Sequence, residues 1–384
     1  MDAVELLTEL VAIDSTNSTL DPAGPGEAAM AARLTELLTG LGFAVAQHEV
    51  APGRPDVLGT LPGDPALGTL LFEAHLDTVP SPPGGIPIER DGRRLYGRGA
   101  CDCKGAIAAM LTAIERVVAA GVPRPTILFA GVVDEETAMT GAAALLDVLP
   151  PVDAALVAEP TSLVPIRAHN GVVRAALTAH GHAAHAAKAH LGVNALVVAA
   201  RAVAALDEDL GRRLAATEHP LAGPGLLTPT VVQGGTAPNV VPDRCEVILD
   251  RRTAPGTGPD EAVREIEAVL ERLRAAGDDV RLGEPFVALP GVETPATHPL
   301  VVAAERAASA ELGRPVTAAG VPFATDACRL LGTGAIPCVV LGPGSIDQAH
   351  TVDEWVDLDE VELAVAVYEG VVRELVALAR EPAG

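Results

Sequence analysis

Apolar and polar residues are arranged along the first 165 positions in a way that predicts helices and strands in turn. Apolar residues recur at helical spacing after Asp2, and again over 27–38 and 107–118. Continuous apolar runs, typical of strands buried on both faces, lie at 69–74, 127–133 and 154–158. We therefore expect an α/β domain in which helices cover a sheet.

The pattern changes after position 170 and later changes back. The elements expected there are a strand, a helix, two strands, a helix and a strand, at 172–178, 195–210, 230–233, 245–250, 260–276 and 280–282. This β-α-β-β-α-β order is that of the ferredoxin-like fold. A helix at 300–312 and a buried strand at 336–341 then resume the first pattern. We expect one domain formed by 1–169 and 287–384, interrupted by a smaller inserted domain at 170–286.

Charge and composition exclude several classes of partner. The 384 residues include 51 Asp and Glu against 27 Lys and Arg, a formal net charge of −24, without a cluster of basic residues. Binding to nucleic acid or to an anionic membrane is therefore not expected. The chain has no apolar run of membrane-spanning length, it starts with acidic residues, and its five cysteines are unevenly spaced. We expect a soluble cytoplasmic protein with reduced thiols.

Candidate catalytic groups follow the three apolar runs, at the sheet edge where α/β proteins bind ligands. His75 and Asp77 share one face of an extended segment, so the carboxylate can orient the imidazole. Three acids at 134–136 follow the second run, and Glu159 follows the third. Taken alone, each feature has an ordinary explanation. A His-x-Asp pair occurs by chance on surfaces, and acids before a helix complement its dipole.

Cys101 and Cys103 flank Asp102 just before the third helix. If this segment is locally extended, both thiols point away from Asp102 and cannot join it on one soft metal, so two small buried thiols are the better interpretation. A wider set of nitrogen and oxygen ligands suits Zn²⁺ or a similar divalent ion, namely His75, Asp102, Glu136, Glu159 and His350. Five such residues fit two metal ions better than one.

Six segments together resemble the M20 metallopeptidase and deacylase family, and within it the acetylornithine deacetylase type. They are AHLDT at 74–78, YGRGACDCKG at 96–105, DEE at 134–136, EPT at 159–161, GGTAPNVVPD at 234–243 and GPGSIDQAH at 342–350. They follow the family's order from about position 70 to the end. The resemblance implies a zinc-dependent exopeptidase-like α/β catalytic domain with an inserted ferredoxin-like lid. The lid commonly mediates dimerisation, so we expect a homodimer.

The resemblance also assigns the metal ligands residue by residue. Asp102 is expected to bridge two divalent ions, with Zn²⁺ the first candidate and Co²⁺ the second. His75 and Glu159 would complete one ion, and Glu136 and His350 would complete the other.

The remaining roles fall on five further positions. Glu135 is expected to be the general base beside the metals, and Asp77 to orient the first histidine. In the lid, His185 is expected to stabilise the oxyanion and Asn239 to contact the substrate. The guanidinium of Arg252 suits the α-carboxylate of an amino acid.

Other polar residues of the lid have plainer interpretations. Arg251 lies on the opposite strand face from its neighbour Arg252 and is expected to be a solvated charge. His180, His182 and His190 have no nearby acid or thiol, so polar surface is favoured over an additional metal site.

The function that the resemblance implies is hydrolysis of an N-acyl amino acid by a hydroxide held between two metal ions. N-acetylornithine is the first candidate for this small-molecule substrate. One alternative keeps the mechanism and changes the substrate, as in succinyl-diaminopimelate desuccinylase or a broader N-acyl-amino-acid hydrolase or peptidase. An alternative of another class is a non-catalytic binder of a small acid or peptide. Such a binder would be expected to have lost a ligand or the base, and this chain retains them all.

Overall fold

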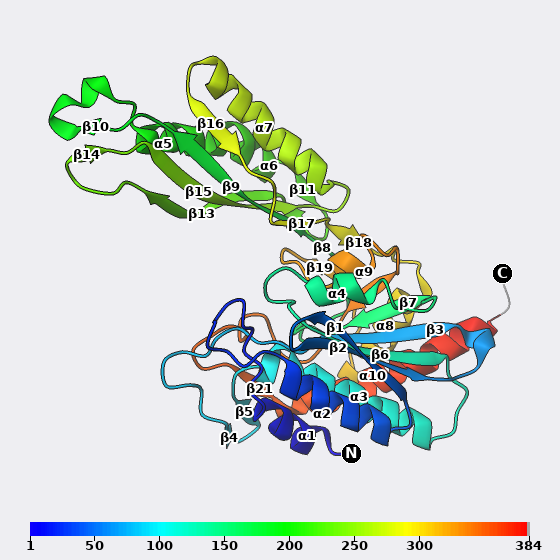
Figure 1. Cartoon of the computed structure of the whole chain (residues 1–384). Helices are drawn as coiled ribbons and strands as arrows, with labels where there is room; N and C mark the ends of the chain where they lie inside the picture. The colour runs from blue at the N-terminus through cyan, green and yellow to red at the C-terminus, as the bar shows by residue number, and fades with distance from the viewer. Residues whose placement is uncertain (382–384) are drawn as a thin grey trace. The chain divides into compact units, whose positions relative to one another are not determined.

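The computed structural model describes residues 1–381 and divides the chain into two compact units (Figure 1). The first, here the α/β unit, contains 1–167, 294–319 and the residues from 325 onward. The second, here the inserted unit, contains 168–293 and 320–324. Among residues 1–381, none of the helices has the combination of length and apolarity that a bilayer span requires.

A nine-stranded mixed sheet forms the centre of the α/β unit. Its order is β1-β2-β6-β3-β7-β20-β8-β18, with β19 beside β8. The strands are β1 Ala44–Ala51, β2 Arg54–Leu61, β3 Thr69–His75, β6 Thr126–Val132, β7 Ala154–Val157, β8 Ile166–His169, β18 Val292–Glu293, β19 Ala319–Val321 and β20 Cys338–Val340. Strands β6, β3, β7 and β20 are parallel to one another. The predicted α/β sheet is confirmed, and the three apolar runs form β3, β6 and β7.

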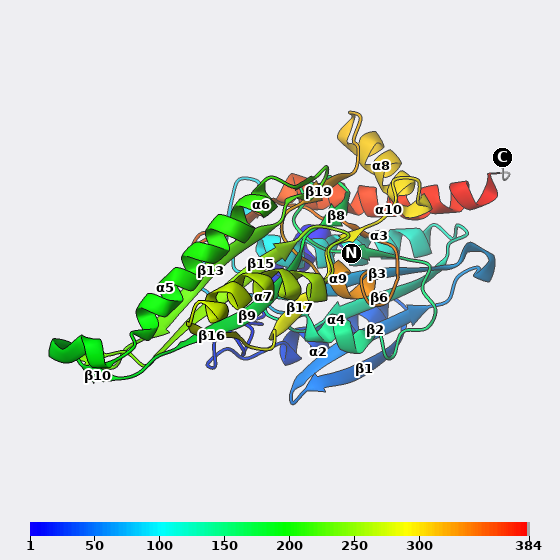
Figure 2. The same ribbon diagram turned by 90° about the horizontal axis from the view of Figure 1, so that it is seen from above.

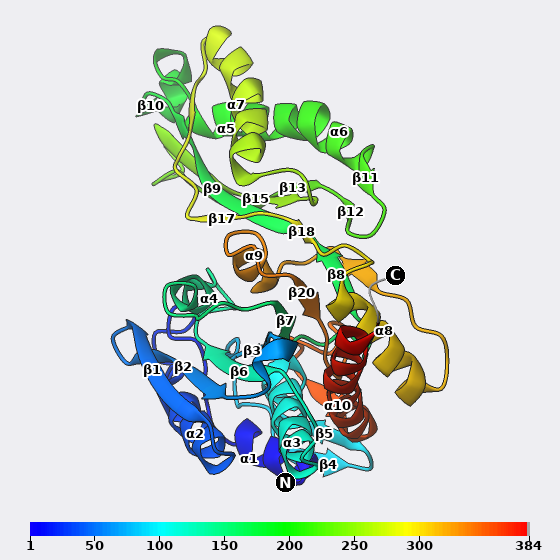
Figure 3. The same cartoon turned by 90° about the vertical axis from the view of Figure 1, so that its right-hand side faces the viewer.

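Helices cover both faces of this sheet (Figure 3). On one face α1, α2, α3, α8 and α10 share a hydrophobic cluster with the strands, with bounds Ala3–Val11, Ala28–Gly40, Gly105–Ala119, Pro299–Leu312 and Leu358–Arg380. On the other face lie the short helices α4, Thr140–Leu145, and α9, Ala327–Leu330. Asp2 caps α1, since its carboxylate accepts the amides of Val4 and Glu5 at 2.9 and 3.0 Å.

Two local features of the α/β unit were not predicted. A three-stranded sheet joins β4 Glu89–Asp91, β5 Arg94–Tyr96 and β21 Trp355–Asp357. The segment before α3, Ala100–Lys104, is an irregular helical turn with non-helical dihedrals at Asp102 and Cys103, rather than an extended stretch.

The inserted unit has the predicted β-α-β-β-α-β order. Its antiparallel sheet runs β13-β15-β9-β16, with β17 also beside β9. Helices α5 and α7 pack on one face of the sheet through a second hydrophobic cluster (Figure 2). The bounds are β9 Gly171–His180, α5 Ala195–Ala205, α6 Arg212–Ala215, β13 Leu226–Gly234, β15 Arg244–Thr253, α7 Pro259–Ala275, β16 Asp279–Leu282 and β17 Val287–Leu289. Two short pairs complete it, β10 Ala184–His185 with β14 Val240–Val241, and β11 Glu218–His219 with β12 Gly223–Pro224.

Candidate metal centre

Acidic and histidine side chains converge at the carboxyl edge of the parallel strands. His75 is the last residue of β3, and Glu159 lies two residues after the end of β7. Glu136 follows β6, and His350 lies in the loop after β20. Parallel strands place their carboxyl ends on one edge, which explains how residues so far apart in sequence meet. Asp102 reaches the same place from the irregular turn before α3.

The Asp102 carboxylate lies between two histidines. Its Oδ1 is 3.0 Å from His75 Nε2, and its Oδ2 is 3.2 Å from His350 Nε2. The same His350 nitrogen lies 3.1 Å from the carboxylate of Glu136. One carboxylate that faces two imidazoles through its two oxygens has the arrangement of a bridging metal ligand.

The donor atoms form groups compact enough to hold metal ions. In one group, donor atoms of His75, Glu135 and Glu159 lie within 4.8 Å of one another. In another, donor atoms of Asp102, Glu136 and His350 meet the same limit. Nitrogen and carboxylate oxygen donors suit Zn²⁺ and similar divalent ions.

The electrostatics of the cluster also fit bound cations. Burial raises the pKa of Glu135 and of Glu159 well above the usual range, and neighbouring carboxylates add to the rise. Such a concentration of buried acids is unfavourable unless protons or cations neutralise it. Divalent ions would supply that charge while using the same oxygens as ligands.

Asp77 faces the His75 imidazole with both its backbone carbonyl and its carboxylate. The closest contact to His75 Nδ1 is the Asp77 backbone carbonyl, at 3.0 Å, whereas the Asp77 carboxylate is 3.6 Å away. A carbonyl acceptor at Nδ1 places the ring proton there and leaves Nε2 free as a ligand atom. The carboxylate accepts the backbone amides of Glu135 and Glu136, both at 3.2 Å.

The cysteines are buried, and one lies closer to the centre than the sequence indicated. The donor atoms of Cys103, His75 and Asp102 form a third compact group. Cys103 can join this group because the segment Ala100–Lys104 is an irregular turn and not an extended stretch. Burial raises the pKa of Cys103 to about 11, and its thiol donates to the His75 carbonyl at 3.5 Å. The interpretation of Cys101 and Cys103 as small buried thiols agrees with their burial, while Cys103 also lies beside two proposed metal ligands.

The three predicted lid residues all lie in the inserted unit. His185 is in β10 opposite Val240, and the next residue, Ala186, donates its amide to the carbonyl of Asn239 at 2.9 Å. The segments of His185 and Asn239 are therefore neighbours. Arg252 lies on β15, where Asp250 holds its guanidinium through Nε at 2.7 Å and Nη2 at 3.3 Å.

The prediction for Arg251 is wrong. Its side chain is 2% exposed and forms an ion pair with Glu265 of α7 at 2.8 Å. The alternation along β15 places Arg251 on the face that the helices cover, and Arg252 on the other face. Among residues 1–381, the metal-type clusters all lie in the α/β unit, and none includes His180, His182 or His190.

Loading the protein with zinc is expected to release protons at pH 8. Hydrogen bonds to Asp102 and Glu136 raise the pKa of His350 to about 10, so without metal the imidazole keeps its proton at this pH. A metal ligand must be a neutral imidazole. Release should therefore occur at pH 8 and fade as the pH rises through about 10. Calorimetric titrations in two buffers of different ionisation enthalpy would measure it. A His350→Ala variant that released as many protons as the wild type would contradict the assignment.

Comparison with known proteins agrees with the class that fold and site define, a metal-dependent hydrolase. The sequence pattern of Peptidase family M20/M25/M40 matches residues 71–374. An acetylornithine deacetylase of Vibrio cholerae is 31% identical over 381 residues, covering 95% of this chain and 96% of that protein. A counterpart from Vibrio campbellii is 30% identical over 379 residues, with the same coverage. The chain belongs to peptidase family M20/M25/M40, and it is a hydrolase acting on amide bonds.

Solved structures share the fold over nearly all of the chain. Aminopeptidase PepT from Bacillus cereus matches with a TM-score of 0.81 and 24% identity, covering 98% of each chain. The YXEP protein of Bacillus subtilis, described as a dinuclear metal-binding peptidase of family M20, matches with a TM-score of 0.72 and 17% identity, again covering 98% of each.

Proposed function

We propose that the protein is a two-metal amidohydrolase that removes a short acyl group from the α-nitrogen of an amino acid, with N-acetylornithine as the first substrate. The observation that carries this proposal is the Asp102 carboxylate, whose two oxygens face His75 and His350 at 3.0 and 3.2 Å. The similarity to acetylornithine deacetylases over 95% of the chain supports the choice of substrate.

The metal positions follow from the side chains around Asp102. His75 and Glu159 would hold one ion with it, and Glu136 and His350 the other. The two imidazoles among the carboxylate donors favour Zn²⁺, with Co²⁺ the next candidate. When bound, the ions supply Lewis-acid activation of a water molecule and of the amide carbonyl.

The remaining chemistry belongs to side chains of this chain. Glu135 would take a proton from the attacking water and deliver one to the departing amine, since its carboxylate lies beside the proposed ligands His75 and Glu159. In the inserted unit, His185 would donate to the oxyanion and Asn239 would contact the substrate. Arg252 would bind the α-carboxylate; its guanidinium is oriented by Asp250 while its side chain stays 25% exposed.

A substrate panel tests the proposal. Zinc-loaded protein should be assayed with N-acetylornithine, N-acetyl derivatives of other amino acids, N-succinyl-diaminopimelate and a dipeptide. Release of ornithine and acetate at the highest kcat/KM is the expected result. If the protein preferred the succinyl substrate or the dipeptide, the proposed substrate would be wrong and the proposed two-metal mechanism would still hold. Hydrolysis of none of them would contradict the proposed function.

The inserted unit is the proposed site of homodimerisation. Its terminal strand, β13, exposes almost its whole length, including Val232 at 62%. Beside it α5 exposes Leu196 and Val197, and a groove of about 280 Å³ lies between these elements. An apolar edge strand of this kind is an aggregation hazard unless a second chain covers it. Pairing of two β13 edges would continue the sheet across the dimer.

A charge on this edge is expected to prevent the pairing. Val232→Lys should sediment as a monomer at concentrations where the wild type is a dimer, because the lysine would be buried without a partner. Val148→Lys, at an exposed apolar position of the α/β unit, is the matched control and should leave sedimentation unchanged. A dimer that persists in Val232→Lys would contradict this interface.

The five cysteines support placing the enzyme in the cytoplasm. All five are buried, and none of them is joined to another in a disulfide. Reduced thiols are typical of cytoplasmic proteins.

A further inference from the structure

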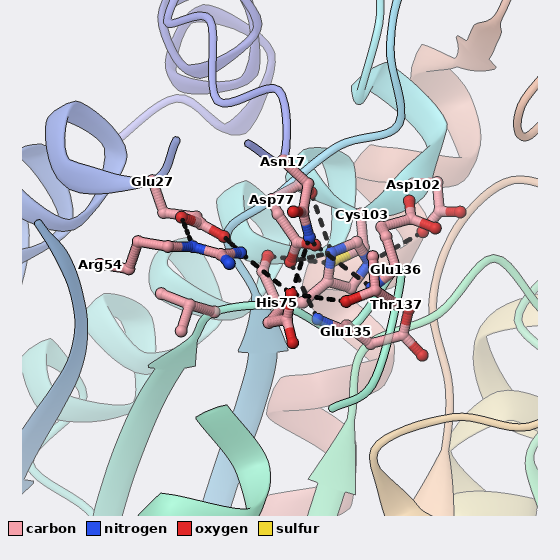
Figure 4. A network of polar contacts seen from close by, with 12 residues as sticks. Asn17, Glu27, Arg54, His75, Asp77, Asp102, Cys103, Glu135, Glu136 and Thr137 are labelled. Atoms are coloured by element: carbon pink, nitrogen blue, oxygen red, sulfur yellow. Dashed lines mark hydrogen bonds and ion pairs between the residues drawn. The ribbon is translucent and has the colours of Figure 1, made fainter. Parts of the chain in front are cut away.

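A buried hydrogen-bond network adjoins the candidate metal centre (Figure 4). At its middle is Asn17, a fully buried residue of the loop after α1. Its amide nitrogen donates to Asp77 Oδ2 at 2.7 Å and to Asp134 Oδ1 at 3.2 Å. Its side-chain oxygen accepts the Thr19 amide at 2.8 Å. This last contact fixes the amide orientation, so that both N–H bonds face carboxylates.

Asp134 determines the path of the chain at the two glutamates that follow it. Its φ is +70°, in the left-handed region, which a residue other than glycine adopts only where its surroundings over-determine it. Its carboxylate accepts hydrogen bonds from Thr137 Oγ1 at 2.6 Å, Thr140 Oγ1 at 2.7 Å and Arg54 Nη2 at 3.1 Å. The turn that presents the proposed general base is therefore held by the Asp134 carboxylate.

Asp77 connects this turn to the first metal position. Its two carboxylate oxygens accept the backbone amides of Glu135 and Glu136, and one of them lies 3.6 Å from His75 Nδ1. Asn17 thus joins two carboxylates with different tasks. One lies behind the metal-binding imidazole, and the other sets the turn of the base.

The charges around Asn17 show why an amide is required there. Asp77, Asp134 and Glu27 are all buried, and Arg54 binds both Glu27 and Asp134. A buried carboxylate is costly unless donors satisfy it, and each hydrogen bond to it is stronger than one between neutral groups. The Asn17 amide supplies donors to two anions at once. A carboxylate at the same place would remove both donors and add a further negative charge beside Asp77 and Asp134.

We propose that Asn17 is a positioning residue that fixes the general base Glu135 relative to the metal-binding His75, through Asp134 and Asp77. This inference rests on the proposed function, because it takes Glu135 as the base of amide hydrolysis. Asn17 itself touches neither metal ligand nor substrate in this scheme. It acts by aligning Glu135 with His75.

Two substitutions at Asn17 separate positioning from packing. Asn17→Asp keeps the side-chain volume and removes the two N–H donors. Asn17→Ala removes the donors and most of the side-chain volume, and leaves space that water can enter. For a positioning role, kcat should fall roughly 10- to 100-fold in Asn17→Asp and by a smaller factor in Asn17→Ala. KM and bound zinc, measured at saturating free zinc, should match the wild type in both. A packing role predicts the opposite order, with Asn17→Ala the worse variant.

The control is Tyr368→Phe, an isosteric loss of one buried hydrogen bond in the same unit, from the Tyr368 hydroxyl to the Leu341 carbonyl at 2.7 Å. It should keep the wild-type kcat while lowering the melting temperature. Equal kcat in wild type and Asn17→Asp, a loss confined to KM, or full recovery with excess zinc would each overturn the positioning role. A wild type that hydrolyses no N-acyl amino acid would instead overturn the proposed function, so the two failures are distinguishable.

Discussion

Replacing Glu135 by Gln is expected to lower kcat by roughly 10²- to 10⁴-fold, the range typical of a lost general acid–base group. Glutamine has the same shape but accepts no proton at neutral pH. The carboxylate is well placed for this task, because its donor atom lies within 4.8 Å of donor atoms of His75 and Glu159. KM for N-acetylornithine and the zinc content should stay close to the wild-type values, since Glu135 is proposed as a base and not as a ligand.

Steady-state kinetics and elemental analysis on the same preparation would check this result. Glu374→Gln is the matched control and should leave kcat unchanged, because Glu374 lies on α10 and its ion pair with Arg306 of α8 is on the surface, away from the centre. Undiminished kcat in Glu135→Gln would show that the assigned mechanism is wrong. Loss of one zinc ion would show that Glu135 is a ligand.

Replacing Asp102 by Asn is expected to weaken both metal positions at once. Its carboxylate oxygens face His75 and His350 separately, so losing the negative charge affects the ion beside each of them. The loss of affinity should exceed the roughly 10- to 100-fold typical of residues that only support a ligand. His350→Ala should weaken one position and spare the other, because the group of His75 and Glu159 remains intact.

Zinc content after equilibrium dialysis at fixed free zinc would distinguish the two variants. Asp102→Asn should lose both ions in parallel with its activity, whereas His350→Ala should keep one. Asp102→Asn that retained one ion at wild-type affinity would rule out a bridging role.

The fold follows closely from the sequence where burial is complete on both strand faces. The apolar runs that become β3, β6 and β7 each end in a histidine or acid, and parallel strands bring these ends together. That is why His75, at the end of β3, and Glu159, just after β7, could be predicted to lie at the same sheet edge. Asp102 and His350 were included as ligand-type residues, but both come from irregular segments, and only the resemblance to the family assigned each to an ion.

Other features of the structure depend on tertiary contacts, which local sequence patterns do not indicate. Asn17 lies 60 positions before Asp77 and 117 before Asp134, and the sequence offered no signal that joins them. For Arg251 the alternation of faces was correctly predicted, but the face covered by α7 was not, because that requires the helix layer. The irregular turn at Asp102 could not be predicted for a similar reason, because distant residues hold its backbone in place. The amides of Cys101 and Asp102, for example, donate to the Glu354 carboxylate at 3.0 and 3.1 Å.

The most direct test compares N-acetylornithine hydrolysis by metal-free and zinc-loaded protein. Metal would be removed with a chelator and restored with Zn²⁺, and ornithine release would be followed in both states. We expect no turnover without metal and full recovery on adding zinc, because the ions that Asp102, Glu136 and His350 are proposed to hold would be missing. Turnover by the metal-free protein at the rate of the zinc-loaded form would contradict a metal-dependent amide hydrolase.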